Sequence, residues 1–365
     1  MQAHREHLLD FDLPGLTEQF KAAGEAAFRA KQVLEWVFER GATTFEQMTN
    51  LSKPLREKLA TQYDLYASTI TRRAASSDGT VKLLLGWPDG ATTECVLIPV
   101  PVEGRYTACI SSQVGCPVGC RFCASGLDGL QRNLTAGQII EQALRVRAEA
   151  VAAGGERLTN VVFMGLGEPL ANYENVLQAA RAINAPWGLE VGARKITIST
   201  VGLPKQIRRL ADEGLQLTLA LSLHAPNESL RAELIPWAEK IRLQEITTAC
   251  RHYFEKTGRE ITLEYILLHG VNDRPEHAAQ LAAFCRQLRC NVNLIRYNPV
   301  EGLPYGRPTS ESTAAFQRHL RERGVNAHVR TSRGLDIDAA CGQLRRKEAA
   351  AGVQITVGEA TPESR

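Results

Sequence analysis

The sequence has no apolar run near the length of about 20 residues that a membrane-spanning helix requires. Its densest apolar stretch, "LTLALSL", covers only residues 217–223. The first residues, "MQAHREHLLDFDLPG", contain acidic side chains and lack the apolar core of a signal peptide. Neither sign of charge dominates, because 43 Lys and Arg face 40 Asp and Glu. We therefore expect a cytoplasmic globular protein with no membrane contact, whose mildly basic charge permits a nucleic-acid partner without requiring one.

Cysteine, by contrast, is well represented, with nine residues. Thiols stay reduced in the cytoplasm, so clustered cysteines suggest metal binding or catalysis rather than disulfides. Cys116, Cys120 and Cys123 lie together in "GCPVGCRFCASG", and no fourth cysteine follows nearby. A structural metal site normally has four protein ligands. Either a distant residue completes this set, or one coordination position stays open.

The N-terminal part of the chain predicts two small units. Residues 14–62 have helical apolar spacing, and Ser52 precedes Pro54 where a helix is expected to begin. Residues 69–99 change to β-rich runs around "WPDG", which predicts a hairpin. The helical positions are Phe28, Val33, Trp36 and Val37. The domains that we predict are a helical accessory module at 1–68, a β-hairpin linker region at 69–104, a main domain at 105–347 and a mobile tail at 348–365.

From residue 105 onward, short apolar β-rich runs alternate with helix-patterned stretches. The runs cover residues 106–112, 160–165, 195–200, 217–225, 261–270 and 291–299. Such alternation predicts an α/β fold with a parallel sheet, and six units fit a partial (β/α)6 barrel. A further run at 327–332 can extend it.

Polar or glycine-rich segments follow five of these strands. They are the three-cysteine loop, "GLGEP" at 165–169, "STVG" at 199–202, "SLHAPN" at 222–227 and "YNPVEG" at 297–302. Functional groups of parallel α/β folds gather at the carboxyl ends of the strands. Five such ends in succession therefore predict a lined pocket.

Three thiolates can hold three irons of a cubane [4Fe–4S] cluster and leave the fourth iron open. The C-x3-C-x2-C spacing, with Phe122 before the last cysteine, is the radical-SAM signature. The open iron would bind the amino and carboxylate groups of S-adenosylmethionine, which the glycines and Glu168 of "GLGEP" would also approach. The alternatives are a zinc site completed by a remote ligand such as Cys109, or reduced surface cysteines.

From about Leu13 to about Leu344 the chain resembles the RlmN/Cfr family of radical-SAM RNA adenosine methyltransferases, and in particular its RlmN branch. The resemblance departs at Val201, where the family usually has a second serine in "STSG", although Ser199 remains. The matching segments are "FRAKQVLEWVFERGATTFEQMTNLSKPLREKL", "CISSQVGCPVGCRFCASG", "VVFMGLGEPLANY", "LALSLHAPN", "YNPVEG" and "DIDAACGQL".

The resemblance implies a reaction that ordinary methyl transfer cannot perform, because carbon 2 of adenine is too electron-poor to attack a sulfonium methyl. It implies that Cys341 takes a methyl group from one S-adenosylmethionine and that a second, reductively cleaved molecule turns this methyl into a radical that adds to the base. Cys109 would then attack the Cys341 sulfur to form a transient disulfide, and Glu94 would remove the C2 proton. Two S-adenosylmethionine molecules are used per turnover, with an electron donor such as flavodoxin or ferredoxin.

The implied substrates are an adenosine of 23S rRNA and the adenosine 3′ of the anticodon in tRNA. Two alternatives stay open: Cfr-type C8 methylation of the same rRNA adenosine, and a zinc-stabilised non-catalytic RNA-binding protein. Cys109 and Cys341 argue against the latter, which has no use for a carrier thiol. The implied contacts of S-adenosylmethionine are Gly167, Glu168, Ser199, Ser222, Leu223, His224 and Asn298.

The remaining cysteines and the basic residues complete the expectations. We interpret Cys95, Cys250, Cys285 and Cys290 as packing residues. The first 95 residues hold eleven Lys and Arg against thirteen Asp and Glu, so this module has no net positive charge. Its possible basic face is Arg29, Lys31, Lys53, Arg56 and Lys58, for which a solvated helix surface is an equal alternative. A phosphate-binding patch beside Cys341 is predicted from Arg318, Arg321, Arg323, Arg330 and Arg333.

Overall fold

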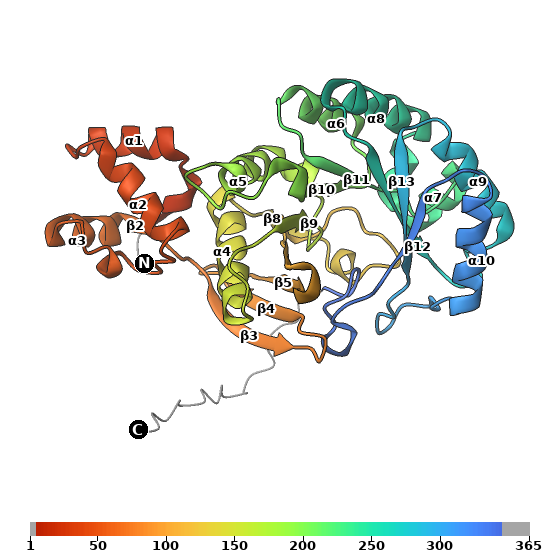
Figure 1. Cartoon of the computed structure of the whole chain (residues 1–365), viewed down its shortest axis with the longest axis horizontal. Coiled ribbons are helices and arrows are strands. Elements are labelled where there is room, and N and C mark those ends of the chain that lie inside the picture. The colour runs from red at the N-terminus through yellow and green to blue at the C-terminus, as the bar shows by residue number, and fades with distance from the viewer. Residues whose placement is uncertain (1–4, 345–365) are drawn as a thin grey trace.

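The computed structural model describes residues 5–344. Figure 1 shows a small helical module at the N-terminal end of the chain, then a set of strands, then a wide sheet with helices on its outside. The tail expected at 348–365 lies outside the described residues, as do the last residues of the predicted main domain. Within residues 5–344, no helix is both long enough and apolar enough to cross a membrane.

The predicted N-terminal helices are confirmed. They are α1 (Leu13–Ala22), α2 (Phe28–Phe38) and α3 (Lys53–Gln62). Ser52 takes the position before α3, but its side chain makes no capping hydrogen bond, so the start of this helix relies on Pro54 in its first turn. Val33 and Val37 are buried as expected. Phe28 is not, because it is 57% exposed at the first position of α2.

One large sheet of ten strands runs through the described residues in the order β14-β13-β12-β11-β10-β9-β6-β5-β4-β3. Its members are β3 (Thr69–Ala75), β4 (Val81–Gly86), β5 (Thr92–Val100), β6 (Arg105–Cys109), β9 (Asn160–Phe163), β10 (Ile196–Thr200), β11 (Thr218–Ser222), β12 (Ile261–Leu267), β13 (Cys290–Arg296) and β14 (Ala327–Arg330). The strands from β6 to β14 are parallel neighbours. The run predicted at 327–332 therefore does extend the sheet.

The hairpin predicted around "WPDG" is confirmed as β4 and β5. It is not a separate linker in space, because β5 pairs antiparallel with β6 and places Val96 opposite Cys109. A strand that the sequence did not announce, β3, pairs with β4 at the sheet edge and is almost entirely exposed. An exposed edge strand carries no buried apolar face, so it has little alternating pattern to detect. The division into domains stays a prediction.

Helices cover the outer face of the parallel strands (Figure 1). They are α4 (Ala136–Ala152), α5 (Tyr173–Asn184), α6 (Pro204–Asp212), α7 (Glu228–Leu234), α8 (Leu243–Thr257), α9 (Pro275–Cys285) and α10 (Ser310–Arg321). The strands they cover are rich in buried Ile, Leu and Val, as parallel strands covered by helices must be. The predicted α/β partial barrel is the fold of this chain. Two small sheets accompany it, one of β1 (Glu6–His7) and β2 (Tyr63–Asp64), the other of β7 (Gln113–Gly115) and β8 (Leu130–Asn133).

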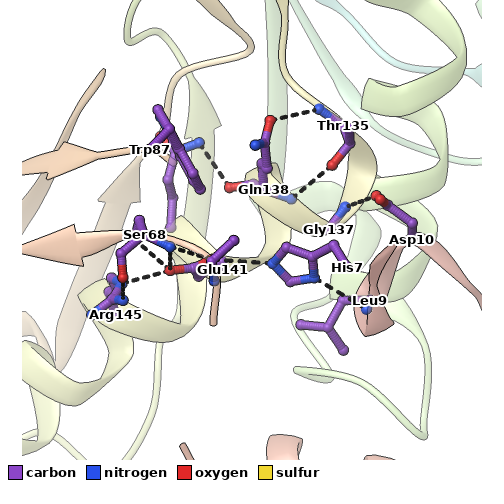
Figure 2. A network of polar contacts seen from close by, with 12 residues as sticks. His7, Leu9, Asp10, Ser68, Trp87, Thr135, Gly137, Gln138, Glu141 and Arg145 are labelled. Carbon is purple, nitrogen blue, oxygen red and sulfur yellow. Dashed lines mark hydrogen bonds and ion pairs between the residues drawn. The ribbon is translucent and has the colours of Figure 1, made fainter. Parts of the chain in front are cut away.

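Glu141, in the middle of α4, joins the N-terminal module to the barrel (Figure 2). Its fully buried carboxylate accepts hydrogen bonds from Nε2 of His7 at 3.1 Å, from the backbone and hydroxyl of Ser68 and from Nε of Arg145 at 2.8 Å. Nδ1 of His7 accepts from the amide of Leu9, which leaves the ring proton on Nε2 to be donated. Burial alone would raise the pKa of Glu141, but His7, Arg145 and Ser68 together hold it below its usual value.

Replacing Glu141 with Gln should destabilise the protein, because it leaves buried donors opposite a neutral amide. We expect the free energy of unfolding at neutral pH to fall by about 3 kcal/mol. A lowered pKa stabilises the fold fully above the unfolded-state value of 4.5 and less as the pH drops below it. The difference between Glu141→Gln and the wild type should therefore shrink below that pH in denaturant titrations.

The control is Glu149→Gln on the same helix, whose carboxylate binds the half-exposed Arg73. It should cost less than about 1 kcal/mol. An equal loss in both variants would contradict a special role of the buried network.

Candidate cofactor and active site

A cavity of about 480 Å³ opens at the carboxyl ends of the parallel strands. Most of the predicted site residues meet here, although they come from seven different segments of the chain. The predicted residues that line it are Cys109, Cys116, Cys120, Cys123, Gly167, Glu168, Ser199, Ser222, His224, Asn298 and Cys341. Two predicted residues, Glu94 and Leu223, are not part of the described lining.

The cysteine loop is closed at its base by the antiparallel pair of β7 and β8. The closure needs glycine at 115, because φ is +76° there and a Cβ atom would lie 1.9 Å from the carbonyl oxygen of Gly129. All three thiols of the loop face the same cavity. Burial raises the pKa of each, that of Cys116 to about 12, and the neighbouring thiols add to the shift of Cys116 and Cys120. A bound cation would reverse this, since coordination deprotonates a thiol.

The donor set suits a cluster better than a single ion. Within residues 5–344, no three His, Cys, Asp or Glu side chains converge closely enough to hold one metal ion. A zinc site would need four ligands about 2.0–2.3 Å from one point. Three cysteines that line one cavity supply the three thiolates that a cubane cluster with one open iron requires.

Arg231, in α7, places a buried guanidinium group beside the cysteine loop. Its side chain is 1% exposed and donates through Nη2 to the carbonyl oxygen of Val201. Nε and Nη1 have no hydrogen-bond partner within the described part of the chain. Burial lowers the pKa of Arg231 to about 10, while Cys120 opposes that shift. Buried donors without partners are rare, so this guanidinium fits a site that receives an anionic group.

Glu168 lines the cavity and is 2% exposed. Its two carboxylate oxygens accept from the amides of Leu170 at 3.0 Å and Val201 at 2.9 Å. Burial raises the pKa of Glu168 to about 7 despite these bonds. A Cβ atom at Gly167 would lie 2.7 Å from the Cβ atom of Gln113, so the chain before Glu168 packs against β7 as only glycine allows. Val201 thus contributes its backbone to both Glu168 and Arg231, a role that its departure from serine leaves intact.

The strands β10 and β11 bring Ser199 and Ser222 together, with their hydroxyl oxygens 3.1 Å apart. His224, two residues later, has a left-handed backbone and packs edge-on against Phe122. Its Nδ1 accepts from the amide of Ile266, so Nε2 carries the proton of the neutral ring. Burial lowers the pKa of His224 to about 3, which keeps the imidazole uncharged at neutral pH. Leu223 differs from its neighbours, because its side chain lies in the hydrophobic core with no exposed surface.

The segment around Cys341 is bound to the cysteine loop. The amide of Ala124 donates to the carbonyl oxygen of Gly342 at 2.8 Å, and Ser125 Oγ to that of Leu344 at 2.7 Å. Asn298 Nδ2 donates to the carbonyl oxygen of Cys341 itself at 3.1 Å. The side chain of Asn298 therefore holds this loop, besides lining the cavity.

Cys109 and Cys341 line the same cavity and lie close to each other. Cys341 is exposed to the cavity, yet it lies deep enough among protein atoms that desolvation raises the pKa of its thiol. Burial also raises the pKa of Cys109, and Cys341 contributes to the shift. Cys109 packs with Leu166 and Ala339 in one apolar cluster. The pair therefore faces one space between β6 and the C-terminal loop.

Glu94 lies in β5, two residues before Val96, which pairs with Cys109. Its carboxylate is 6% exposed and forms an ion pair of 3.0 Å with Nζ of Lys82. It points away from Cys95, whose side chain is fully buried in the main core, as alternation along β5 predicts.

Sequence reasoning missed four charged residues of this region: Lys82, Arg231, Glu264 and Arg105. Glu264 lines the cavity and accepts from Asn293 Nδ2 at 2.9 Å, and burial raises its pKa. Two of them, Lys82 and Glu264, could have been noticed in the sequence as a single charged residue inside an apolar strand, in "TVKLLLG" and "ITLEYILL". A buried charge in such a place needs a partner or a function.

The other cysteine and arginine predictions have mixed outcomes. Cys95, Cys250 and Cys285 are buried and Cys290 packs against the same core, which confirms them as packing residues. Of the five arginines expected beside Cys341, Arg330 and Arg333 line the cavity. Arg321 instead binds the carbonyl oxygen of Ala327, and Arg323 that of His319. The phosphate-binding patch itself stays a prediction.

Two family models match the chain. One is described as the ribosomal RNA large subunit methyltransferase N-terminal domain and matches residues 6–65. The other is described as the radical SAM superfamily and matches residues 110–282. Together with the three-cysteine cavity, they define a radical SAM enzyme, whose cofactors are a [4Fe–4S] cluster and S-adenosylmethionine.

Comparison with related proteins shows to which family of radical SAM enzymes the chain belongs. The chain is 46% identical to the probable dual-specificity RNA methyltransferase RlmN of Rhodopirellula baltica, over 94% of this chain and 91% of that protein. It is 45% identical to that of Thermotoga neapolitana, over 94% and 98%. A crystal structure of a radical SAM methyltransferase from Sphaerobacter thermophilus matches with a TM-score of 0.91 at 45% identity, over 94% of this chain and all of that one. The chain belongs to the RlmN family and is a SAM-dependent RNA methyltransferase.

Proposed function

We propose that the protein methylates carbon 2 of adenosine in 23S rRNA and of the adenosine 3′ of the anticodon in tRNA, and that it acts in the cytoplasm. The dual-specificity name of its relatives supports two RNA substrates. The observation that carries the proposal is the bond between Ala124 and Gly342, which sets Cys341 against the cysteine loop. A methyl carrier must reach both the cofactor and the base. Cys341 lines the same cavity as the three loop cysteines, where the cofactor would bind.

We assign the binding of the cofactors to three cysteines that line the cavity and to a buried arginine beside their loop. Cys116, Cys120 and Cys123 would bind the cluster, and the buried guanidinium of Arg231 would pair with an anionic group nearby. Glu168, Ser199, Ser222 and Asn298 supply polar atoms for S-adenosylmethionine, and neutral His224 offers a hydrogen bond from Nε2. The side chain of Leu223 is buried, so this residue could contact S-adenosylmethionine only through its main chain. When bound, the cluster supplies the electron that cleaves S-adenosylmethionine, drawn from a donor such as flavodoxin or ferredoxin.

The chain's own residues would carry the methyl group. The thiolate of Cys341 would attack the methyl carbon of one S-adenosylmethionine, with S-adenosylhomocysteine as the leaving group, and would then carry the methyl to the adenine. A second S-adenosylmethionine, when bound and cleaved, would supply the radical that takes a hydrogen atom from the methyl on Cys341, so two molecules would be used per turnover. Glu94 takes the C2 proton, and Cys109 attacks the sulfur of Cys341 as the methylated base leaves, which yields a disulfide. Burial raises the pKa of the Cys341 thiol, and Arg330 opposes this shift.

Mass spectrometry of RNA nucleosides tests this proposal. The chain is expressed in a host that lacks its own enzyme, and 2-methyladenosine should appear in 23S rRNA and in tRNA. The inactive control is Cys341→Ala. Methyl groups at C8 would favour the Cfr-type reaction instead, and methylation of rRNA alone would remove tRNA from the proposal.

A further inference from the structure

Lys82 in β4 contacts two parts of the chain that are far apart in sequence. Its Nζ lies 3.0 Å from a carboxylate oxygen of Glu94 in β5 and donates to the carbonyl oxygen of Asp338 at 3.0 Å. The side chain is only 12% exposed. Asp338 lies three residues before Cys341. One ammonium group thus touches both the proposed base and the loop of the proposed carrier.

Two further hydrogen bonds join the segment before Cys341 to the turn between β3 and β4. Asp78 accepts from the amide of Gly334 at 3.0 Å, and Asp336 accepts from the amide of Ser77 at 3.2 Å. Gly334 has φ of +63°, and a Cβ atom there would lie 2.8 Å from a methyl of Thr80. The turn between β3 and β4 and the segment 334–338 are therefore fitted closely to each other.

These contacts differ in what they can do for the reaction. The bonds of Asp78 and Asp336 hold the loop but touch no proposed catalytic group. Lys82 contacts both the loop and the carboxylate of the proposed base, and its charge compensates for the burial of Glu94. Any shift of the loop at Asp338 moves the partner of Lys82, and with it the surroundings of Glu94.

We propose that Lys82 is a positioning residue that couples Glu94 to the loop carrying Cys341. It holds the base and the methyl carrier in one arrangement while the adenine is bound to both. The inference rests on the proposed function, in which Glu94 removes the C2 proton. Methylation of Cys341 does not depend on it, because Ala124 and Asn298 hold the carrier against the cysteine loop from the other side.

The test compares Lys82→Met, Lys82→Arg and Glu94→Gln with the wild type, using reconstituted enzyme and an RNA substrate. Lys82→Met should methylate Cys341 at nearly the normal rate but accumulate about tenfold more covalent protein–RNA adduct, as Glu94→Gln does. Lys82→Arg keeps the charge and should restore turnover. The control is Lys195→Met, an exposed lysine next to the amino end of β10, which should behave as the wild type.

The outcomes separate the inference from the proposed function. Without an adduct in Glu94→Gln, the role of Glu94 as base fails. With an adduct there but normal turnover in Lys82→Met, the role of Lys82 fails. A parallel loss of Cys341 methylation and turnover would reduce Lys82 to a structural residue and would also overturn the proposal. If Lys82→Met does not fold, Lys82→Gln is measured in its place, with the same results deciding.

Discussion

Cys109→Ala should accumulate a covalent protein–RNA adduct, whereas Cys341→Ala should form neither adduct nor product. The two thiols face the same space but act at different times in the proposed reaction. Without Cys341 no sulfur accepts the methyl group. Without Cys109 the methyl is accepted and added to the base, and no thiol is then left to release it. Product formation should fall by at least about a thousandfold in both variants.

The adduct is measured as a slow band in denaturing gels, which ribonuclease trims to a nucleotide-sized mass on the peptide that contains Cys341. Cys290→Ala is a matched control, since this thiol packs outside the cavity beside Cys285. It should turn over normally. Full turnover of Cys109→Ala without an adduct would show that resolution needs no disulfide and would leave Cys109 as a packing residue.

Replacing any one of Cys116, Cys120 and Cys123 with Ala should abolish the cluster and all cleavage of S-adenosylmethionine. The wild type, purified without oxygen, should be brown and contain about four irons per chain. Each variant should lose this colour after reconstitution, because two thiolates cannot hold the cubane in place. Iron analysis, absorption spectra and the yield of 5′-deoxyadenosine provide the measurements.

Cys250→Ala serves as the comparison, because its thiol is buried in the main core away from the cavity. It should retain full iron content even where its stability is reduced. A tightly bound stoichiometric zinc in the wild type, with no uptake of iron, would contradict the cluster at this site.

The elements that could be predicted from the sequence are those with strong local signals. The cysteine spacing, the strands of the barrel and the helices of the N-terminal module all depend on patterns within a few residues. Exposed β3 escaped prediction because it has no buried face. Phe28 shares the helical spacing of Val33 and Val37 but is 57% exposed, because position in a periodic pattern does not say where a helix meets its partners.

Other site residues could be assigned only through resemblance. Nothing in the residues around Cys341 or Cys109 identifies them as a pair, since one follows a loop at the end of the chain and the other ends a strand. Glu94 was expected at the site; it is not among the lining residues of the cavity and forms an ion pair with Lys82. Its partner could not be foreseen, because a lysine in an apolar strand does not reveal which carboxylate faces it.

The sequence by itself determined the chemistry that the protein can hold: three thiols at fixed spacing, glycines where the backbone must turn closely, and strand ends rich in polar groups. Only the tertiary structure decided which groups act on one another. The contacts from Ala124 to Gly342 and from Lys82 to Asp338 join segments more than 200 residues apart. Such contacts follow from the order of strands in the sheet and the packing of the C-terminal loop against it. They depend on the whole fold, so no local pattern encodes them.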